Sequence, residues 1–260
     1  MKKKCIRPEK SDWRNDEVEE ARPFCNTCVR PKRVCLCEYI TTEKNSCSIG
    51  ILQHPNEVGK TFNTAKVAQL SLENSFLYEG VNFDEHKGFQ KTLNSFTDSK
   101  VGILYPSSTA KDLSMAPNDL ECLIVLDGTW PEAKQILKRN ATLQALPHYA
   151  FTPKQISNYI LRKEPKVNYV CSLEAIVESL RILERNETGF TSLLTTLQRM
   201  IDIQEALRHT NSRHKSSPEF ADIKREIKNI KKVLYSQNVE QVDIVALQIK
   251  LKALESKLLE

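Results

Sequence analysis

Glycine is scarce in this chain, with only seven among its 260 residues. No two glycines lie close enough to form the Gly-x-Gly element of a dinucleotide-binding loop, and the sequence has no P-loop. Both loops depend on glycine because their backbone must approach a phosphate closely. The scarcity also disfavours the glycine-rich nucleotide loop of ordinary methyltransferases. A nucleoside ligand would therefore need a different architecture.

Long apolar runs are absent as well. No stretch reaches the roughly eighteen apolar residues that a membrane span needs, and no apolar signal segment follows the basic start Met1-Lys-Lys-Lys4. We therefore expect an intracellular, cytoplasmic protein, with a nuclear location left open. The net charge of +5 permits an anionic partner but does not require one.

Four of the eight cysteines form a cluster, at Cys25, Cys28, Cys35 and Cys37. A Cys-x2-Cys turn and a Cys-x-Cys bend can together close a tetrahedral shell of four thiolates, which is typical of a structural zinc site. Protein would fill every position, so the metal would support the fold and would not catalyse. The alternative is disulfides or free thiols, which a reducing compartment disfavours. Cys122 is interpreted as a small buried residue of a strand.

Composition divides the chain into four expected parts. Residues 1–20 are polar and charged and predict a mobile arm, and residues 21–45 form a cysteine module that would fold on its metal. Residues 46–210 hold the main domain. Residues 211–260 begin as a linker and continue with amphipathic, heptad-like spacing. These last helices could pack on the main domain, form a homodimer or bind a helical partner, and the short repeat leaves these alternatives open.

The main domain alternates strand-like and helix-like patterns. Apolar runs predict strands at 47–53, 75–78, 101–105, 122–126 and 148–151. Apolar residues at helical spacing predict helices at 57–72, after 129, at 172–185 and at 192–208. This alternation predicts an α/β fold with a mostly parallel sheet.

One of these strands ends in a polar segment that is the most informative part of the sequence. Its apolar run is followed at once by Asp127, and Thr129 with Glu132 then fits a helix-capping box. Ligands of open α/β sheets bind beyond the carboxyl ends of the strands. Asp127, Thr129 and Trp130 are therefore candidates for a ligand site, and the alternative is a plain strand-to-helix turn.

Polar residues also follow two other predicted strands. His54, Lys60 and Asn63 surround the end of the first strand and could contact a ligand, although His54 could equally be a structural group. Pro106 and Ser107 follow the strand at 101–105. They could shape a nucleoside-binding loop, but a simple turn explains them better.

The last group of candidates lies near the predicted helix at 172–185. Arg162 could clamp a carboxylate or phosphate, or could be a solvated surface charge. Ser172 is expected to cap the helix, whose free N–H groups suit an anion, and Glu174 would suit an ammonium group. An ordinary helix start explains both residues without a ligand. Phosphates could bind basic residues at Arg30, Lys32, Arg33, Lys138, Arg139 and 208–215.

Taken together and in order, these segments resemble the DTW-domain family of tRNA-uridine aminocarboxypropyltransferases. The resemblance covers residues 22 to about 205 and leaves the C-terminal helices outside. One departure is Cys171-Ser172, where the family usually has Ser-Thr. The matching segments are Arg22-Pro23 with the four clustered cysteines, Gln53-His54-Pro55-x-Glu57, Asn63-Thr64-Ala65, Asp127-Gly128-Thr129-Trp130, Tyr159 with Arg162 and Pro165, and Ser172-Leu173-Glu174-Ala175.

The resemblance implies S-adenosylmethionine as donor and N3 of a tRNA uridine as acceptor of its 3-amino-3-carboxypropyl group, with release of methylthioadenosine. It also implies a SPOUT-like fold, which can be knotted and which seats the donor without a glycine-rich loop. Asp127 is then the candidate base beside N3. Glu174 and Arg162 would hold the ammonium and carboxylate of the donor.

The remaining residues of the expected site fall into two groups. The donor would contact Pro106, Ser107, Gly128, Thr129, Trp130, Arg162, Ser172 and Glu174. The RNA would contact His54, Lys60, Asn63 and Arg139. For Trp130 the alternative is packing in the core. The target uridine must be unpaired or flipped out.

Two other functions stay open at this point. One is a SPOUT-type RNA methyltransferase that uses the same donor. The other is a non-catalytic, zinc-containing RNA-binding module.

Overall fold

The computed structural model describes residues 23–60, 62–153 and 170–211, together with the single positions Glu226, Ile230, Lys250 and Leu251. The chain divides into two units, Met1–Glu205 and Ala206–Glu260. The finer division into four parts stays a prediction. None of the helices in the described part of the chain combines the length and apolar character needed to cross a membrane.

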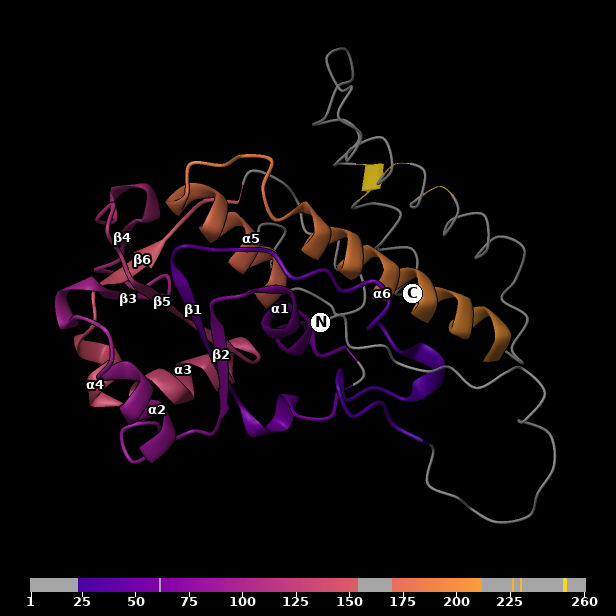
Figure 1. Ribbon diagram of the computed structural model, residues 1–260, viewed down its shortest axis with the longest axis horizontal. Helices are drawn as coiled ribbons and strands as arrows, with labels where there is room; N and C mark the ends of the chain where they lie inside the picture. Colours follow the sequence, from indigo (N-terminus) through magenta and orange to yellow (C-terminus); the bar gives the residue numbers. More distant parts are fainter. Residues whose placement is uncertain are drawn as a thin grey trace. The chain divides into compact units, whose positions relative to one another are not determined.

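A parallel sheet lies at the centre of the first unit. Within the described residues it has six strands in the order β2-β1-β5-β3-β6-β4, and every neighbouring pair is parallel (Figure 1). The inner strands β1 and β5 are buried on both faces, as sheets covered by helices on both sides require. The predicted α/β class is confirmed. The strands are β1 (Ser48–Gln53), β2 (Ser75–Glu79), β3 (Val101–Leu104), β4 (Lys111–Asp112), β5 (Cys122–Asp127) and β6 (His148–Ala150).

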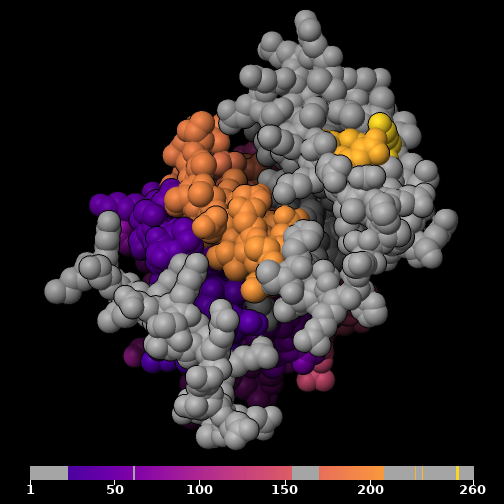
Figure 2. Space-filling view, turned by 90° about the vertical axis from the view of Figure 1, so that its right-hand side faces the viewer, coloured from indigo at the N-terminus to yellow at the C-terminus, as the bar shows by residue number. Residues whose placement is uncertain are grey.

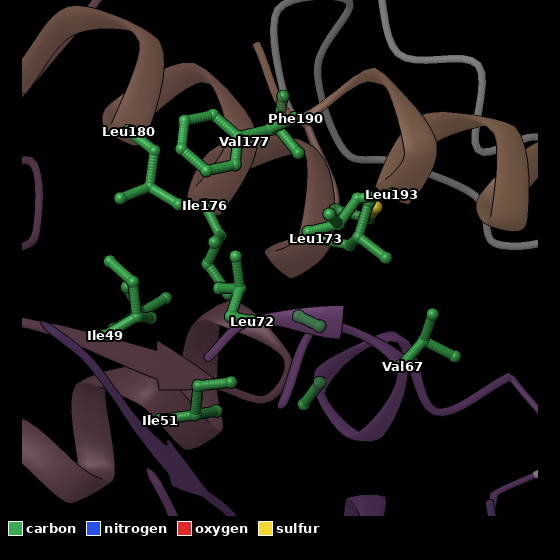
Figure 3. Packing of buried hydrophobic residues seen from close by; sticks show 14 of the residues in the cluster. Ile49, Ile51, Val67, Leu72, Leu173, Ile176, Val177, Leu180, Phe190 and Leu193 are labelled. Atoms are coloured by element: carbon green, nitrogen blue, oxygen red, sulfur yellow. The ribbon is translucent and has the colours of Figure 1, made fainter. Parts of the chain in front are cut away.

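Helices cover both faces of this sheet. Successive residues of a strand point to opposite faces, so each inner strand packs against helices on both sides. Ile49 and Ile51 of β1 pack in a cluster with α1 (Thr64–Ser71), α5 (Ser172–Leu183) and α6 (Thr191–Asn211). Figure 3 shows residues of β1, α1, α5 and α6 in this layer. Leu52 of the same strand packs in a second cluster with α2 (Lys87–Leu93), α3 (Trp130–Arg139) and α4 (Ala141–Ala145).

Short 3-10 turns complete the first unit. They are η1 (Lys32–Val34), η2 (Pro55–Glu57), η3 (Asp98–Lys100) and η4 (Leu113–Met115). Several short elements carry too little periodicity to be predicted from the sequence. These are β4, α2, α4 and the four 3-10 turns.

The helix predicted at 57–72 begins later than expected, at Thr64. The segment before it forms η2 and then turns through Gly59, whose positive φ of 74° does not continue a helix. Asn63 starts α1 instead, because its side-chain oxygen accepts the Lys66 N–H at 2.9 Å. The prediction placed Asn63 inside the helix, and this was wrong.

The helix predicted at 172–185 has a different N-cap and an earlier end. Its first residue is Ser172, but the N-cap is Cys171, and the helix ends at Leu183. Arg185, with a positive φ of 51°, turns the chain away from the helix. The cap predicted for Ser172 was wrong because its hydroxyl donates to Asp127 instead.

Residues 211–260 lie almost wholly outside the described residues. Within the second unit, Lys250 pairs with Glu226 at 2.7 Å, and Ile230 and Leu251 are buried. Amphipathic helices, a homodimer and a helical partner stay predictions for this segment. A knot in the chain likewise stays a prediction.

Gly50 tests the packing of β1. A Cβ there would lie 2.5 Å from Phe76 Cζ and 2.6 Å from Ile124 Cδ1. We therefore expect Gly50→Ala to lower the free energy of unfolding by about 1–3 kcal/mol, measured by urea denaturation. Gly80→Ala is the matched control, because its nearest neighbours are Phe83 ring atoms at an ordinary 3.5 Å. Equal effects of the two substitutions would contradict the close packing of β1.

Candidate active site

A buried carboxylate lies at the carboxyl end of the central strand β5. Asp127 is paired in register with Gln53 at the end of β1. The Gln53 side-chain amide donates to Asp127 Oδ2 at 2.7 Å, and the Ser172 hydroxyl donates to Oδ1 at 2.5 Å. Asp127 is only 6% exposed, so these donors replace part of the water that a charged group loses on burial. The two hydrogen bonds fix the orientation of the carboxylate.

Asn63 holds this network from the other side. Its Oδ1 accepts from the Gln53 amide at 3.1 Å, and its own amide donates back to Gln53 at 3.3 Å. The same Oδ1 caps α1. The start of α1 and the orientation of Gln53 are therefore determined together.

A cavity of about 460 Å³ opens beside Asp127. It lies at the carboxyl ends of β3, β5 and β6, and α1, α3 and α5 all begin at its wall. The amino ends of helices are positive, so the wall suits an anionic group such as a carboxylate. Five aromatic side chains add flat apolar surface that suits a nucleoside: Phe62, Tyr105, Trp130, Tyr149 and Phe151.

Trp130 stands at this cavity and not in the core. It is 38% exposed, and its ring lies 6.4 Å from that of Tyr105, at 59° to it. Burial raises the pKa of the Tyr105 hydroxyl above its ordinary value. The alternative that Trp130 packs in the core does not hold. Both rings line the cavity.

The four clustered cysteines meet in a small module at the start of the described chain. All four sulfur atoms lie within 4.8 Å of one another, with Cys25 and Cys37 Sγ 3.6 Å apart and Cys28 and Cys35 Sγ 3.7 Å apart. Burial, followed by the hydrogen bond with Cys25, raises the pKa of Cys37 to about 12. Four packed thiols of this kind can hold a metal ion, which would stabilise their thiolates.

Contacts with α1 and α6 help to attach this module to the main domain. Leu70 of α1 packs against the cysteines. Arg30 is 2% exposed and donates to the Val34 carbonyl at 3.1 Å and to Met200 Sδ at 3.1 Å. In Figure 2 the indigo residues of the module lie beside the orange helix α6. Arg30 is thus a structural residue, and its burial contradicts the predicted contact with phosphate.

Comparison with known proteins agrees with this architecture. Residues 22–205 match the family model of the DTW domain. This chain belongs to the DTW-domain family. It is similar to tRNA-uridine aminocarboxypropyltransferase 2 of Mus musculus, with 30% identity over 72% of this chain and 65% of the mouse protein. The chain therefore spans slightly less than two thirds of that relative.

Two further relatives extend the comparison. The protein of the same name from Drosophila melanogaster is 32% identical over 63% of this chain and 67% of its own length. The tRNA-uridine aminocarboxypropyltransferase A of Arabidopsis thaliana is 24% identical over 72% of this chain and 83% of its own length. No solved structure matches the chain significantly.

In this DTW-domain chain, the residues expected at the site separate into two groups. The cavity is lined by Asn63, Pro106, Asp127, Gly128, Thr129, Trp130 and Ser172. The cavity wall does not include Ser107 and Glu174, which were expected to contact the donor, nor His54, Lys60 and Arg139, which were expected to contact the RNA. Arg162 lies outside the described residues.

The second group has structural partners of its own. The Glu174 carboxylate accepts the Cys171 N–H at 2.9 Å and so caps α5. Ser107 bonds His148 at 2.8 Å, and Arg139 is exposed near the end of α3. Lys60 pairs with Glu57 at 2.8 Å.

His54 connects the end of β1 to α3. Its ring is buried, with Nδ1 accepting the Asn56 N–H at 3.2 Å and Nε2 lying 3.3 Å from the Gln135 oxygen. Its backbone N–H donates to the Asp127 carbonyl at 2.8 Å. His54 therefore supports the strand end that carries Asp127.

Three residues of the site were absent from the sequence-based candidates: Gln53, Glu57 and Tyr105. Gln53 could have been found, since it ends a predicted buried strand just as Asp127 does. Glu57 ends one of the matching segments, but the sequence predicted it as the first residue of a helix and gave no sign that its carboxylate is buried in the cavity wall. Only the fold reveals its place.

Glu132 tests how the segment Asp127-Gly128-Thr129-Trp130 is stabilised. Its carboxylate accepts the Thr129 N–H at 2.8 Å and hydroxyl at 2.7 Å, and the Asn56 amide at 2.8 Å. Burial raises its pKa, but the bonds from Thr129 and Asn56 and the nearby His54 outweigh burial and lower the pKa from 4.5 to about 2. The charge therefore stabilises the fold fully above pH 4.5, and this stabilisation is lost as the pH falls toward 2.

We expect Glu132→Gln to lower the free energy of unfolding at pH 7 by about 1 kcal/mol, a typical value for a helix cap. The difference from the unsubstituted protein should shrink below pH 4.5 and vanish near pH 2. Melting temperature against pH measures both effects. Glu73→Gln, at an exposed position outside the helices, is the control and should not change stability at pH 7. A difference that stays constant with pH would contradict the role of the charge.

Proposed function

We propose that this protein transfers the 3-amino-3-carboxypropyl group of S-adenosylmethionine to N3 of a uridine in tRNA. The family membership and the shared name of the curated relatives support this activity. The structural observation that supports it most directly is the buried, oriented carboxylate of Asp127, which lines an aromatic cavity of about 460 Å³. A volume of this size suits a nucleoside ligand.

The walls of the cavity fit the chemical parts of such a donor. Tyr105 and Trp130 offer flat surfaces for an adenine or a uracil ring. The amino ends of α1, α3 and α5 suit the donor carboxylate. Glu57 is our candidate for its ammonium group, because its buried carboxylate lines the cavity, and the ammonium would share this carboxylate with Lys60. Glu174 does not line the cavity and caps a helix. Arg162 stays our second candidate for the carboxylate.

Asp127 acts on the acceptor in this proposal. When bound, the donor supplies a carbon made reactive by its positively charged sulfur. N3 of uridine forms the new bond to that carbon, the carbon–sulfur bond breaks, and the electron pair leaves with neutral methylthioadenosine. Asp127 accepts the N3–H hydrogen bond and takes the proton as the bond forms. Gln53 and Ser172 keep the carboxylate oriented throughout.

We also infer that the four-cysteine module binds structural zinc. A tetrahedral site with Zn–S bonds of about 2.3 Å requires sulfur atoms about 3.8 Å apart. The separations of 3.6 Å and 3.7 Å fit this requirement. All four ligand positions come from protein, so the ion would hold the fold of Cys25–Cys37 and take no part in transfer.

Asp127→Asn tests the proposed reaction. The amide keeps the size of the side chain but cannot take the proton, so we expect aminocarboxypropyl transfer to fall by about 100-fold or more. The assay is mass analysis of tRNA nucleosides after incubation with the donor. Binding of S-adenosylmethionine, measured by calorimetry, should persist.

Asp112→Asn is the matched control, because Asp112 also accepts hydrogen bonds from a serine but is exposed and lies outside the cavity wall. Its transfer rate should equal that of the unsubstituted protein. Unchanged transfer by Asp127→Asn would remove Asp127 from the reaction. A methyl-sized gain in nucleoside mass would contradict the proposed reaction and support a methyltransferase.

Metal removal tests the zinc proposal. A strong chelator should release one zinc ion per chain and expose four further thiols to Ellman's reagent, with a lower melting temperature. Cys47 and Cys122 should stay unreactive, because burial raises the pKa of both thiols, that of Cys47 to about 12. Cys47→Ala is the control and should leave the number of newly exposed thiols at four. A smaller number would contradict a four-cysteine site.

A further inference from the structure

The cysteine module presents apolar side chains to solvent. We call residues 24–31 the cysteine hairpin, because this segment holds Cys25 and Cys28. Phe24 and Val29 belong to it, yet each is 52% exposed. The hairpin is closed by a bridge between Phe24 and Pro31 and by the Cys25 N–H, which donates to the Arg30 carbonyl at 2.8 Å. The backbone of the hairpin is thus well ordered by these contacts, and a lack of structure does not explain why the two side chains are exposed.

Val29 is in a backbone conformation that valine disfavours. Its φ of 54° lies in the left-handed region, where a β-branched side chain is strained and glycine is not. The turn needs this conformation, since the Val29 N–H donates to the Cys25 carbonyl at 2.9 Å. A half-exposed valine adds little to the core that would offset the strain. Packing in the core therefore does not explain why valine occupies this position.

Positive charge lies next to these two side chains in the sequence. Lys32 and Arg33 belong to η1, which follows the hairpin directly, and Arg33 is exposed. Among the described residues neither forms an ion pair. Arg30 is buried, so the outward positive charge of this segment comes from Lys32 and Arg33. Exposed aromatic and apolar groups beside cations are typical of surfaces that bind single-stranded nucleic acid.

Helix α1 sets the distance between this surface and the cavity. Thr64 at its start lines the cavity, and Leu70 near its end packs against the clustered cysteines. Six residues of helix span about 9 Å. An RNA with one base in the cavity must extend over neighbouring protein surface, and the cysteines that Leu70 contacts lie about this far along α1 from the cavity wall.

We propose that the cysteine hairpin is a tRNA contact surface for the nucleotides that flank the target uridine. Phe24 stacks on an unpaired base, Val29 packs against the nucleotide beside it, and Arg33 contacts a phosphate. This inference rests on the proposed function, which supplies tRNA as the substrate. The cysteine module would then bind tRNA in addition to folding around its metal.

The test is the dissociation constant of the full-length, zinc-loaded protein for bulk tRNA lacking the modification, measured by fluorescence anisotropy without donor. Phe24→Leu keeps apolar bulk but removes the stacking ring, and should weaken binding about tenfold. Val29→Gly should also weaken binding, yet leave the melting temperature equal or higher because it relieves backbone strain. Arg33→Gln should reduce the slope of log Kd against log salt by about one.

Met115→Ala is the control, because Met115 is 75% exposed but belongs to η4, outside the hairpin. Its Kd should equal that of the unsubstituted protein. Unchanged tRNA binding by both Phe24→Leu and Val29→Gly would overturn the inference. The assay contains no donor, so a protein that binds tRNA through this hairpin but transfers no group would refute only the proposed function. Absence of tRNA binding by the unsubstituted protein would refute both.

Discussion

The arrangement of the site depends on burying one negative charge, the Asp127 carboxylate, at the end of a central strand. Such a charge needs hydrogen-bond donors that do not move, and two elements distant in sequence supply them. Gln53 donates from β1 and Ser172 donates from α5. Asn63 then fixes Gln53 and starts α1. One buried group thus ties the sheet register to the start of two helices.

The other acidic residues near this charge divide between structure and ligand binding. Glu132 and Glu174 each accept the backbone N–H at the start of a helix, so they hold the cavity wall in shape. Glu57 is different, because its buried side chain lines the cavity while it also pairs with Lys60. A ligand with both an anionic and a cationic end can therefore find helix amino ends and a carboxylate in one space. The amino-acid part of the proposed donor has these two ends.

The metal module and the cavity form one functional region in our proposals, because α1 contacts both. Thr64 belongs to the cavity wall, and Leu70 packs against the cysteines. Arg30 adds a second attachment through Met200 of α6. A module too small for a core of its own thereby gains a fixed position beside the site. In our proposals, that position allows a structural metal to organise a tRNA contact surface.

The sequence by itself determined the parallel α/β class, the four-cysteine cluster and the place of Asp127 at a strand end, because these follow from local periodicity and spacing. The tertiary structure alone decided which residues meet there. Strand order brings Gln53 beside Asp127, and long-range packing buries Arg30 and Glu57. Capping rules predicted the bonds of Glu132 but could not show whether Ser172 would cap α5 or reach across to β5. That choice is made by burial of a distant charge, which no local pattern encodes.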